Sequence, residues 1–380
     1  MKRLLIHFER LGPYHLARIH AAHTFFSAQG WQVTACEIAS RDRTYQWREE
    51  SGDSAFDRIT LFPGKEYDSL TPQEIRGAVT RALGQMAPDA VVICGYYSPD
   101  ACALLSSARR LGARAILMSE STRGDHRRNP LKELFKAWRL RGFHSALCGG
   151  IPHRDYLIGL GMPAGKIFTG YNAVDNDFFE RESRVAVEKE LIPDCLRQLA
   201  PGRFFLASNR FVPRKNLGAL IGAYADYARR VNEPWGMVLL GDGPERSFLE
   251  SLVHKHKLTD KVFFSGFRQI DELPAFYAHA GVFVHVPLSE PWGLVVNEAM
   301  ACGLPVIVSS TAGCARDLCR HGINGLQVDP RSAEQIARAL EAVSTHSSVR
   351  ESFARESRSI IRDYSPGQFA QGLWKAVTVA

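Results

Sequence analysis

Short apolar segments alternate with longer segments along most of the chain, and in the longer ones apolar residues recur every three or four positions. The first pattern is typical of buried strands and the second of amphipathic helices. The predicted strands are 4–8, 31–36, 90–94, 113–118, 204–207, 237–240, 262–264, 282–286 and 305–308. The predicted helices between them include 15–29, 100–111, 217–230, 245–257 and 294–301. Strands that are apolar without alternation, separated by helices, indicate α/β architecture with parallel sheets covered on both faces.

Length and boundary signals predict two domains. A chain of 380 residues exceeds what one compact core usually holds, and 45% hydrophobic with 23% charged residues excludes a disordered chain, a collagen and a coiled coil. The polar, turn-rich segment 171–177 precedes a second strand–helix series that starts near Arg203. We therefore predict doubly wound, Rossmann-like domains over 1–172 and 173–365, facing a ligand cleft at the carboxyl ends of their strands.

The net charge and the cysteines limit the possible function classes and the cellular compartment in which the protein is expected. The formal net charge of +7 is mild; it permits an anionic substrate or a membrane surface and gives no nucleic-acid signature. The eight cysteines form no C-x-x-C pair and lie mostly in apolar runs, which is typical of buried thiols in a reducing compartment. The apolar start is too short for a signal peptide, and the longest uncharged stretch, 299–315, is too short for a membrane span. We expect a cytoplasmic protein, at most peripheral at the inner face of a membrane.

The segment 282–308 carries the strongest chemical signal. Its first predicted strand is followed by P-L-S-E-P-W-G and then by a helix that is apolar on nearly all sides. The start of that helix, from Trp292 to Val295, presents free backbone amides that suit a phosphate. Glu290 precedes these amides and Glu298 lies about two turns further on, a spacing that would suit a sugar diphosphate joined to a ribose. The alternative is that Glu290 is a surface loop acid and Glu298 pairs with a buried arginine.

A basic segment, 208–216, follows another predicted strand and opens a helix. Arg210 and Lys215 lie five positions apart across a turn, so both can reach one site, where arginine offers a two-pronged contact to phosphate and lysine a point charge. A solvated basic loop is the alternative, weakened because the Glu290 loop should lie at the same sheet edge. His285 lies in an apolar strand and is predicted to be a core histidine, and no spacing of His, Cys and Asp matches a metal site.

These motifs resemble those of one enzyme family. The run E-P-W-G-L-V-V-N-E, from Glu290 to Glu298, resembles the E-x7-E signature of the family 4 retaining glycosyltransferases (glycosyl transferases group 1), which have the GT-B fold. Further similar segments are R-x4-K at 210–215, G-x-G-P at 241–244, the nucleobase-side strand at 262–267 and a closing loop at 313–325, with Asp317 where the family commonly has Glu. The resemblance is dense over 203–330 and loose in the first half.

The resemblance implies a role for each residue at the donor site. Arg210 and Lys215 would neutralise the diphosphate leaving group, Glu290 would hold hydroxyls of the donor sugar, and Glu298 would bind the ribose. The remaining donor contacts would come from Phe267 on the nucleobase side, from the amides around Trp292, Gly293 and Leu294, and from Gly12, which lets the first loop approach the diphosphate.

The same resemblance implies the substrates and the course of the last helix. The donor would be a sugar nucleotide of the UDP or GDP type, transfer would retain the anomeric configuration, and a helix over about 366–380 would return to the first domain. Preorganised cations and helix dipoles can stabilise the departing diphosphate without a metal, so neither a metal nor a cofactor is expected. Asp175-Asn176-Asp177 formally matches the D-x-D of metal-dependent transferases, but it falls in the hinge and is rejected as a metal site.

Two features depart from the family pattern. The first loop carries Leu11-Gly12 where members often have paired glycines. Members also commonly have a histidine after the strand that matches 115–118, where this chain has S-E-S-T. Glu120 is the positional candidate for that polar catalytic role, with Asp125 or His126 as alternatives, and a solvated loop acid is an equally simple interpretation.

The segment 123–141 is basic and amphipathic. Seven of its residues are Arg or Lys, and Leu131, Leu134, Phe135 and Trp138 fall at helical spacing. Such a helix is typical of a membrane-surface contact, which would fit a lipid-linked or otherwise anionic acceptor. The commoner interpretation is that the four apolar residues pack on the sheet of the first domain and the charges are solvated.

The sequence therefore predicts a glycosyltransferase that moves a sugar from a nucleotide-diphosphate donor to a glycan or lipid-linked acceptor held by the first domain, with no nucleic-acid partner. Two alternatives remain open at this point: a non-hydrolysing nucleotide-sugar epimerase, and a sugar-nucleotide-binding protein without catalysis. A dinucleotide oxidoreductase is disfavoured because no G-x-G-x-x-G follows the first strand.

Overall fold

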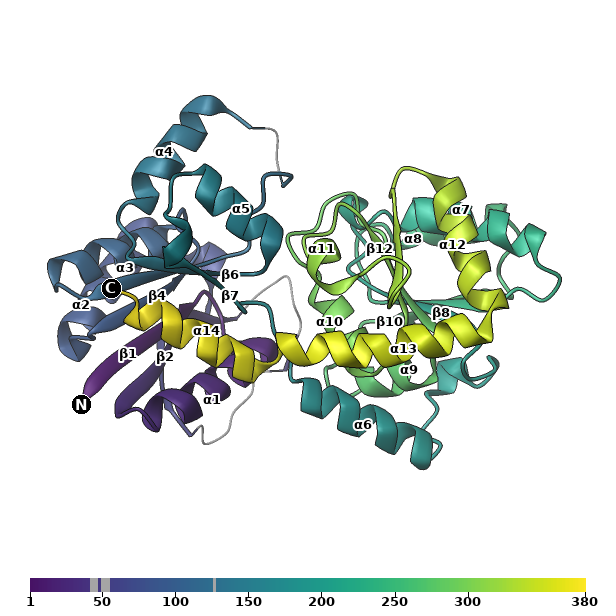
Figure 1. Ribbon diagram of the computed structural model, residues 1–380, viewed down its shortest axis with the longest axis horizontal. Coiled ribbons are helices and arrows are strands. Elements are labelled where there is room, and N and C mark those ends of the chain that lie inside the picture. Colours follow the sequence, from purple (N-terminus) through teal and green to yellow (C-terminus); the bar gives the residue numbers. More distant parts are fainter. Residues whose placement is uncertain (42–46, 49–54, 126–127) are drawn as a thin grey trace. The chain divides into compact units, whose positions relative to one another are not determined.

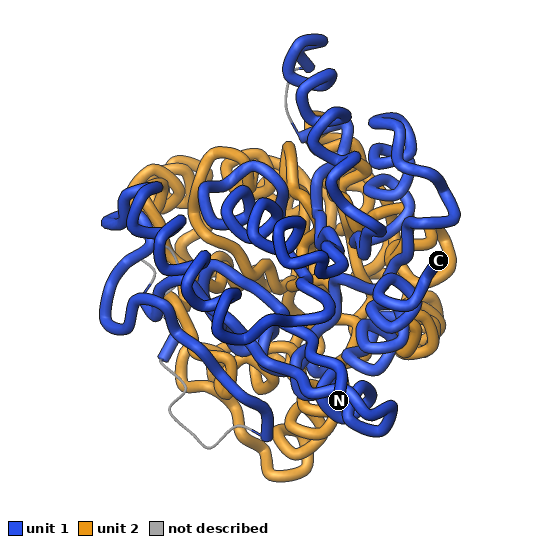
Figure 2. Tube along the Cα trace, turned by 90° about the vertical axis from the view of Figure 1, so that its left-hand side faces the viewer, with its two compact units in different colours: residues 1–175, 364–380 blue, residues 176–363 orange. Residues whose placement is uncertain are grey.

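The computed structural model describes residues 1–41, 47–48, 55–125 and 128–380, which form two compact units (Figure 2). Unit 1 consists of residues 1–175 and 364–380, and unit 2 of residues 176–363. The domain boundaries predicted from the sequence lie at 172/173 and near 366. Each unit contains one parallel sheet flanked by helices, so the predicted α/β class is confirmed (Figure 1).

Unit 1 has a seven-stranded sheet in the order β3-β2-β1-β4-β5-β6-β7. Its strands are β1 Lys2–Phe8, β2 Trp31–Arg41, β3 Asp57–Glu66, β4 Ala90–Cys94, β5 Arg114–Ser119, β6 Ser145–Cys148 and β7 Ile167–Thr169. Its helices are α1 Pro13–Ser27, α2 Pro72–Met86, α3 Pro99–Arg110, α4 Pro130–Leu140, α5 Ile151–Gly159 and α14 Pro366–Thr378. The order reverses between β1 and β4, which makes this pair the switch point of the sheet.

Unit 2 has a six-stranded sheet in the order β10-β9-β8-β11-β12-β13. Its strands are β8 Phe204–Ser208, β9 Gly236–Leu240, β10 Val262–Gly266, β11 Val282–His285, β12 Val306–Ser309 and β13 Gly325–Val328. Its helices are α6 Asn176–Glu188, α7 Leu217–Arg230, α8 Arg246–Lys255, α9 Leu273–His279, α10 Leu294–Ala301, α11 Ala315–Leu318, α12 Ala333–Thr345 and α13 Ser347–Ile361. Here the switch point lies between β8 and β11, and open parallel sheets bind ligands outside the carboxyl ends of such a pair.

Strand β1 shows how both faces of the unit 1 sheet are covered. Leu5 packs in an apolar cluster with residues of α2 and α3, such as Val79. The neighbouring Ile6 points to the opposite face and packs with residues of α1 and α14, such as Leu373. Apolar side chains on both faces explain why this strand reads as a continuous apolar run rather than an alternating one.

Helix α14 belongs to unit 1 although it follows unit 2 in the chain. It lies beside α1 (Figure 1), and it approaches β7 so closely that a Cβ atom on Gly372 would overlap the carbonyl oxygen of Thr169. The buried Ser145 hydroxyl donates a 2.6 Å hydrogen bond to the carbonyl oxygen of Ala376. These contacts fasten residues 364–380 to unit 1.

Helix α4 corrects one sequence interpretation. Leu131, Leu134, Phe135 and Trp138 do not pack on the sheet; all four side chains are exposed to solvent. The side of α4 that faces the rest of unit 1 is occupied largely by charged groups that hydrogen-bond there, so the apolar stripe turns outward. His126 and Arg127 of the same segment lie outside the described residues. Among the helices that are described, none has both the length and the low polarity that a membrane crossing requires.

The packing of α14 can be tested by truncating Leu373, which is fully buried. We expect Leu373→Ala to lower the free energy of unfolding by about 2–5 kcal/mol, because it removes buried methyl groups and leaves a cavity. Urea titration of the purified chain measures this change. Gln371→Ala, on the exposed side of the same helix, is the matched control and should change the unfolding free energy by less than about 0.5 kcal/mol. Equal effects of the two substitutions would contradict the docking of α14 on this core.

Candidate functional site

Two loops meet at the switch point of unit 2. One follows β8 and carries the basic segment 208–216, and the other follows β11 and carries Glu290. The amide of Leu288 donates a 2.9 Å hydrogen bond to the carbonyl oxygen of Arg214. The side-chain amide of Asn216 donates to the carbonyl oxygens of Val286, at 3.1 Å, and Pro330, at 2.8 Å. The topology of the sheet thus brings together two segments that the sequence singled out separately.

The joined loops hold a compact cluster of charges. The ammonium group of Lys215 forms a close ion pair with the Glu290 carboxylate. The Arg214 guanidinium nitrogen Nη1 lies 3.9 Å from Oε1 of Glu290, and Nε2 of His285 lies 3.6 Å from Oε2. Glu290 is 8% exposed, so it is not a surface loop acid.

The cluster fixes the protonation of its members. Burial alone would raise the pKa of Glu290, but His285 and Lys215 outweigh that effect and lower the pKa to about 2. Burial and the two neighbouring cations lower the pKa of His285 below its ordinary value, against the opposing pull of Glu290. At neutral pH the site therefore holds an ionised Glu290 and a neutral His285. His285 is the buried residue that the sequence predicted, but its position beside Glu290 was not foreseen.

Helix α10 begins directly after this cluster. Gly293 precedes the helix with φ = +104°, and a Cβ atom there would lie 3.1 Å from Nε2 of His285, so the residue is constrained both in conformation and in space. The buried Trp292 indole donates a 2.8 Å hydrogen bond to the side chain of Asn297, which holds the turn against the helix. The amide of Gly313 also donates to the carbonyl oxygen of Glu290, at 2.9 Å. The amides of Gly293 and Leu294 at the helix start lack acceptors within the helix.

Glu298 lies within α10 and is fully buried. The Tyr277 hydroxyl on α9 donates a 2.7 Å hydrogen bond to its Oε2. In the structure this carboxylate therefore links α9 and α10. Its assignment to the ribose of a donor stays a prediction, because contact with a ligand requires the carboxylate to become accessible.

Arg210 lies two residues beyond β8 and is partly buried. Its loop rests on the G-x-G-P turn after β9: the amide of Phe211 donates to the carbonyl oxygen of Asp242 at 2.9 Å. A Cβ atom on Gly241 would overlap the carbonyl oxygen of Asn209, so the close approach of the two loops requires glycine there. Phe267 follows the adjacent β10 and is 37% exposed at the same edge of the sheet.

Unit 1 carries the remaining predicted residues, at the carboxyl edge of its own sheet. Gly12 precedes α1 with φ = −115°, and a Cβ atom would have no neighbour nearer than 3.8 Å, so the protein itself does not require glycine at this position. The loop is held by Glu37, a buried carboxylate on β2 that accepts a 2.8 Å hydrogen bond from the amide of Leu11. Arg58 and Thr60 on β3 donate to the same carboxylate, each at 2.7 Å. Sequence reasoning missed Glu37; its signal was a charged residue in a largely apolar run.

Glu120 follows β5 and is partly buried. It lies close enough to Cys94 and Tyr171 to affect both: desolvation raises the pKa of the Cys94 thiol to about 12, and the charge of Glu120 contributes to the same shift. It also helps to raise the pKa of Tyr171, for which burial is again the main cause. Of the two alternatives to Glu120, Asp125 has both carboxylate oxygens engaged by the amide and hydroxyl of Thr122, each at 2.6 Å. His126 lies outside the described residues.

The D-x-D sequence lies at the junction of the two units. Asp175 ends the first part of unit 1, and Asn176 begins α6, where its side-chain amide donates a 2.9 Å hydrogen bond to the carbonyl oxygen of Ile361. Within residues 1–41, 47–48, 55–125 and 128–380, no three His, Cys, Asp or Glu side chains gather in an arrangement that could hold a metal ion.

Comparison with protein families identifies the domain that carries the charge cluster. The family model for glycosyl transferases group 1 matches residues 196–360, which include both loops of the switch point. The match covers less than half of the chain, so the similarity to this family is shown for residues 196–360. The resemblance inferred from the E-x7-E and R-x4-K segments is therefore confirmed.

Curated relatives align with this chain over part of their length. One is a GDP-mannose-dependent alpha-(1-6)-phosphatidylinositol monomannoside mannosyltransferase of Mycobacterium tuberculosis, 37% identical over 140 residues, which are 35% of this chain and 36% of the relative. Another is a lipopolysaccharide core biosynthesis glycosyltransferase of Rhizobium meliloti, 34% identical over 166 residues, which are 44% of this chain and 45% of the relative. The chain thus spans less than half the length of these curated relatives.

Among solved structures, the Anabaena protein HepE in complex with UDP and glucose is similar to the whole chain, with a TM-score of 0.72 over 100% of both chains. The sequence identity is 16%, so this likeness shows the fold alone. The fold is GT-B, as the sequence predicted.

The ionisation of Glu290 makes the stability of the folded chain depend on pH. Because the pKa is lowered to about 2 in the folded chain, from an ordinary value near 4.5, the ionised group stabilises the fold above pH 4.5. That contribution declines as the pH falls from 4.5 towards 2. We expect the unfolding free energy of the wild type to exceed that of Glu290→Gln at pH 6, and the gap to narrow by about 2 kcal/mol at pH 3. Urea titrations of both proteins at the two pH values measure the gap, and a constant gap would contradict the lowered pKa.

Proposed function

We propose that the chain transfers a sugar from a nucleoside-diphosphate sugar of the UDP or GDP type to a glycan or lipid-linked acceptor, with the donor diphosphate bound at the β8 and β11 loops of unit 2. The observation that carries the proposal is the joined pair of loops at the switch point. There Lys215 and Glu290 contact each other directly beside the start of α10. A cation, a carboxylate and free amides in one place match the three parts of such a donor: diphosphate, sugar hydroxyls and phosphate oxygens.

The chemistry requires charge to be stabilised on both sides of the breaking bond. When the bond between the anomeric carbon and the diphosphate breaks, positive charge develops on the sugar ring and negative charge on the leaving diphosphate. Lys215 and Arg210 would receive the negative charge together with the amides of Gly293 and Leu294, and these groups are already held in place by the packing of the two loops. Retention of the anomeric configuration is proposed from the family resemblance.

Glu290 would accept hydrogen bonds from the sugar hydroxyls. Its pKa of about 2 keeps it an acceptor across the physiological range, so it can hold the sugar but cannot serve as a proton donor there. Phe267 would lie against the nucleobase. Glu298 would bind the ribose by exchanging its hydrogen bond with Tyr277 for one with a ribose hydroxyl.

Unit 1 would hold the acceptor. We assign to Gly12 the role of letting its loop approach the diphosphate. The space around its Cβ position is open, so no contact within the protein explains why this residue is glycine. We assign the acceptor-side carboxylate to Glu120, at the end of β5. A lipid-linked or anionic glycan acceptor is supported by the named substrate of the mycobacterial relative and by the lipopolysaccharide role of the Rhizobium relative.

Substitutions in the charge cluster test the donor site. We expect Lys215→Ala and Glu290→Ala each to lower kcat for sugar transfer by at least about a hundredfold, because each removes a group that contacts the donor in the transition state. A radiolabelled transfer assay with the matching acceptor measures the loss. Lys261→Ala removes a partly exposed lysine elsewhere in unit 2, paired with Asp260, and should leave kcat unchanged. Turnover at the wild-type rate in both cluster variants, with folded protein, would refute the assignment.

Nucleotide binding separates this proposal from the alternatives. In a thermal-shift comparison of UDP, GDP, ADP and NAD, we expect UDP or GDP to raise the Tm by several degrees, since a ligand at a hundred times its Kd stabilises by about 2.7 kcal/mol. An epimerase would convert the donor sugar with no acceptor present. A binding protein would show a higher Tm with the nucleotide but would turn over no sugar nucleotide. A shift with NAD alone would overturn the proposed site.

A further inference from the structure

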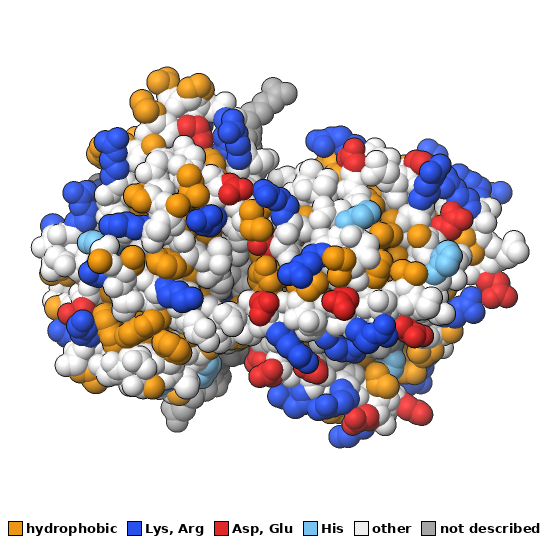
Figure 3. Space-filling model, in the orientation of Figure 1, with side chains coloured by type: hydrophobic (Ala, Val, Ile, Leu, Met, Phe, Trp, Pro, Cys, Tyr) orange, Lys and Arg blue, Asp and Glu red, His pale blue; other side chains and the backbone are white. Residues whose placement is uncertain are grey.

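Helix α4 of unit 1 turns its apolar side to solvent. Leu131 is 78% exposed, Leu134 71%, Phe135 44% and Trp138 62%; we call these four residues the outer face of α4. Figure 3 shows hydrophobic side chains gathered at the top of the view, over this helix. The ring of Tyr97, 65% exposed in the loop after β4, lies 6.4 Å from that of Phe135 and extends the patch.

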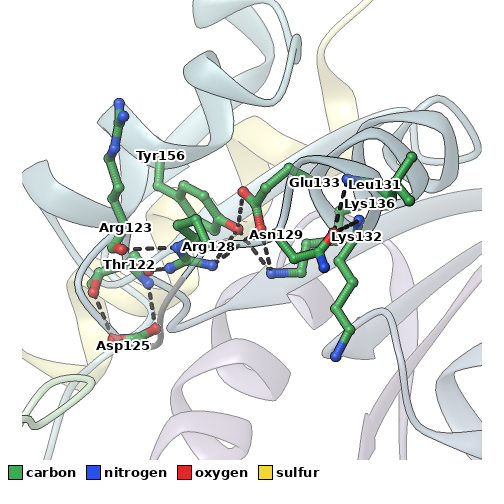
Figure 4. Close-up of polar contacts among 10 residues, drawn as sticks. All are labelled: Thr122, Arg123, Asp125, Arg128, Asn129, Leu131, Lys132, Glu133, Lys136 and Tyr156. Carbon is green, nitrogen blue, oxygen red and sulfur yellow. Dashed lines mark hydrogen bonds and ion pairs between the residues drawn. The ribbon is translucent and has the colours of Figure 1, made fainter.

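The opposite side of α4 is held to unit 1 by polar contacts (Figure 4). The Glu133 carboxylate accepts hydrogen bonds from Nζ of Lys136 at 2.9 Å and from the hydroxyl of Tyr156, on α5, at 2.8 Å. Lys136 and Arg128 also donate to the Tyr156 hydroxyl, at 3.0 and 2.8 Å. The Arg128 guanidinium stacks over the Tyr156 ring with 4.5 Å between its carbon and the ring centroid. Four polar side chains therefore form one network on the side where an ordinary amphipathic helix places its apolar residues.

This orientation reverses the usual one. A surface helix of a water-soluble protein normally turns its apolar stripe inward, and contiguous exposed apolar patches usually mark an interaction site. Along α4 only Leu140 is buried. The network around Glu133 fixes the orientation, because turning the helix to bury its apolar stripe would separate Glu133 from Tyr156. The outer face is thus a stable, exposed surface that requires an apolar partner.

The charges around the outer face identify the kind of partner. Lys132 and Arg141 are exposed beside it, and the guanidinium of Arg139 lies 5.9 Å from the ring of Phe135. Glu133 is the only carboxylate of α4, and it is turned inward and neutralised by Lys136 and Arg128. The partner must therefore combine an apolar layer with negative charge at its surface, which is the chemistry of an anionic lipid bilayer.

We propose that α4 docks on the surface of an anionic phospholipid bilayer, with its outer face in the boundary between head groups and acyl chains. Trp138 and Tyr97 suit that boundary because their rings are apolar and carry one polar group. A second copy of this chain fits less well, since a two-fold contact through the outer face would place like charges opposite each other with no carboxylate of α4 between them. The surface lies in unit 1 and the proposed donor site in unit 2, so the inference does not rest on the proposed function.

Co-sedimentation with vesicles tests the proposal. We expect the wild type to bind vesicles made of equal parts phosphatidylcholine and phosphatidylglycerol, and to bind pure phosphatidylcholine vesicles far more weakly. Leu134→Ser/Trp138→Ser should lower the partition coefficient at least about tenfold, because these side chains no longer leave water on binding. Lys132→Gln/Arg141→Gln should lower it about fivefold for each charge removed, and added salt should reproduce that loss. Both pairs are exposed, so circular dichroism and Tm should match the wild type.

Two controls make the outcome specific. Val187→Ser/Leu191→Ser replaces side chains of unit 2 that are 55% and 52% exposed, and it should bind the mixed vesicles like the wild type. The vesicle-induced blue shift of tryptophan fluorescence should shrink in Trp138→Phe, which retains the apolar face. Failure of the wild type to bind mixed vesicles, or equal loss in both serine pairs, would overturn the proposal. So would a dimer in analytical ultracentrifugation that Leu134→Ser/Trp138→Ser dissociates while vesicle binding is absent, because the occupant would then be a second copy.

Discussion

The carboxylate of Glu290 lies almost out of contact with water, and it stays ionised only because cations are held against it. The main one, Lys215, stands 75 residues earlier in the chain. A buried carboxylate with its partner removed would carry an uncompensated charge, which costs several kcal/mol, so the two loops must be positioned together. The adjacency of β8 and β11 supplies that positioning, and the order β10-β9-β8-β11-β12-β13 follows from building the sheet outward from β8 in both directions. The glycine contacts of the β9 turn and the hydrogen bonds of Asn216 refine the same arrangement.

Much of this arrangement was predictable because strands buried on both faces appear in the sequence as short, continuous apolar runs. β1, β4, β8, β9, β11 and β12 are short apolar runs, and all were predicted within one or two residues. Four strands were missed. β3 is a partly exposed edge strand, β7 has three residues, and β13 has two partly exposed residues among four. β6 is fully buried but has only four residues. The fold class and the family resemblance could therefore be inferred from sequence, whereas the full extent of each sheet could not.

The candidate site likewise contains residues that could be predicted from the sequence and residues that could not. Arg210, Lys215 and Glu290 could be selected because their residue types and spacing suit a diphosphate sugar. Glu37 could not, since its role depends on hydrogen bonds from Leu11 and Thr60, which only the pairing of β2 with β1 and β3 brings together. The orientation of α4 could not be predicted from the sequence for a related reason. A periodic pattern shows that a helix has two sides, but which side faces the protein was decided by Tyr156, a residue of another helix.

The attachment of α14 to unit 1 has a consequence for synthesis of the chain. Unit 2 is one continuous segment, residues 176–363, whereas unit 1 needs residues 364–380 to cover one face of its sheet. Domains generally fold as units while the chain emerges from the ribosome. The second unit in sequence is therefore the first that can complete its core. The β1 strand, made before unit 2, keeps part of its apolar surface uncovered until α14 has been synthesised, so it is among the last segments to be protected from aggregation and chaperone binding.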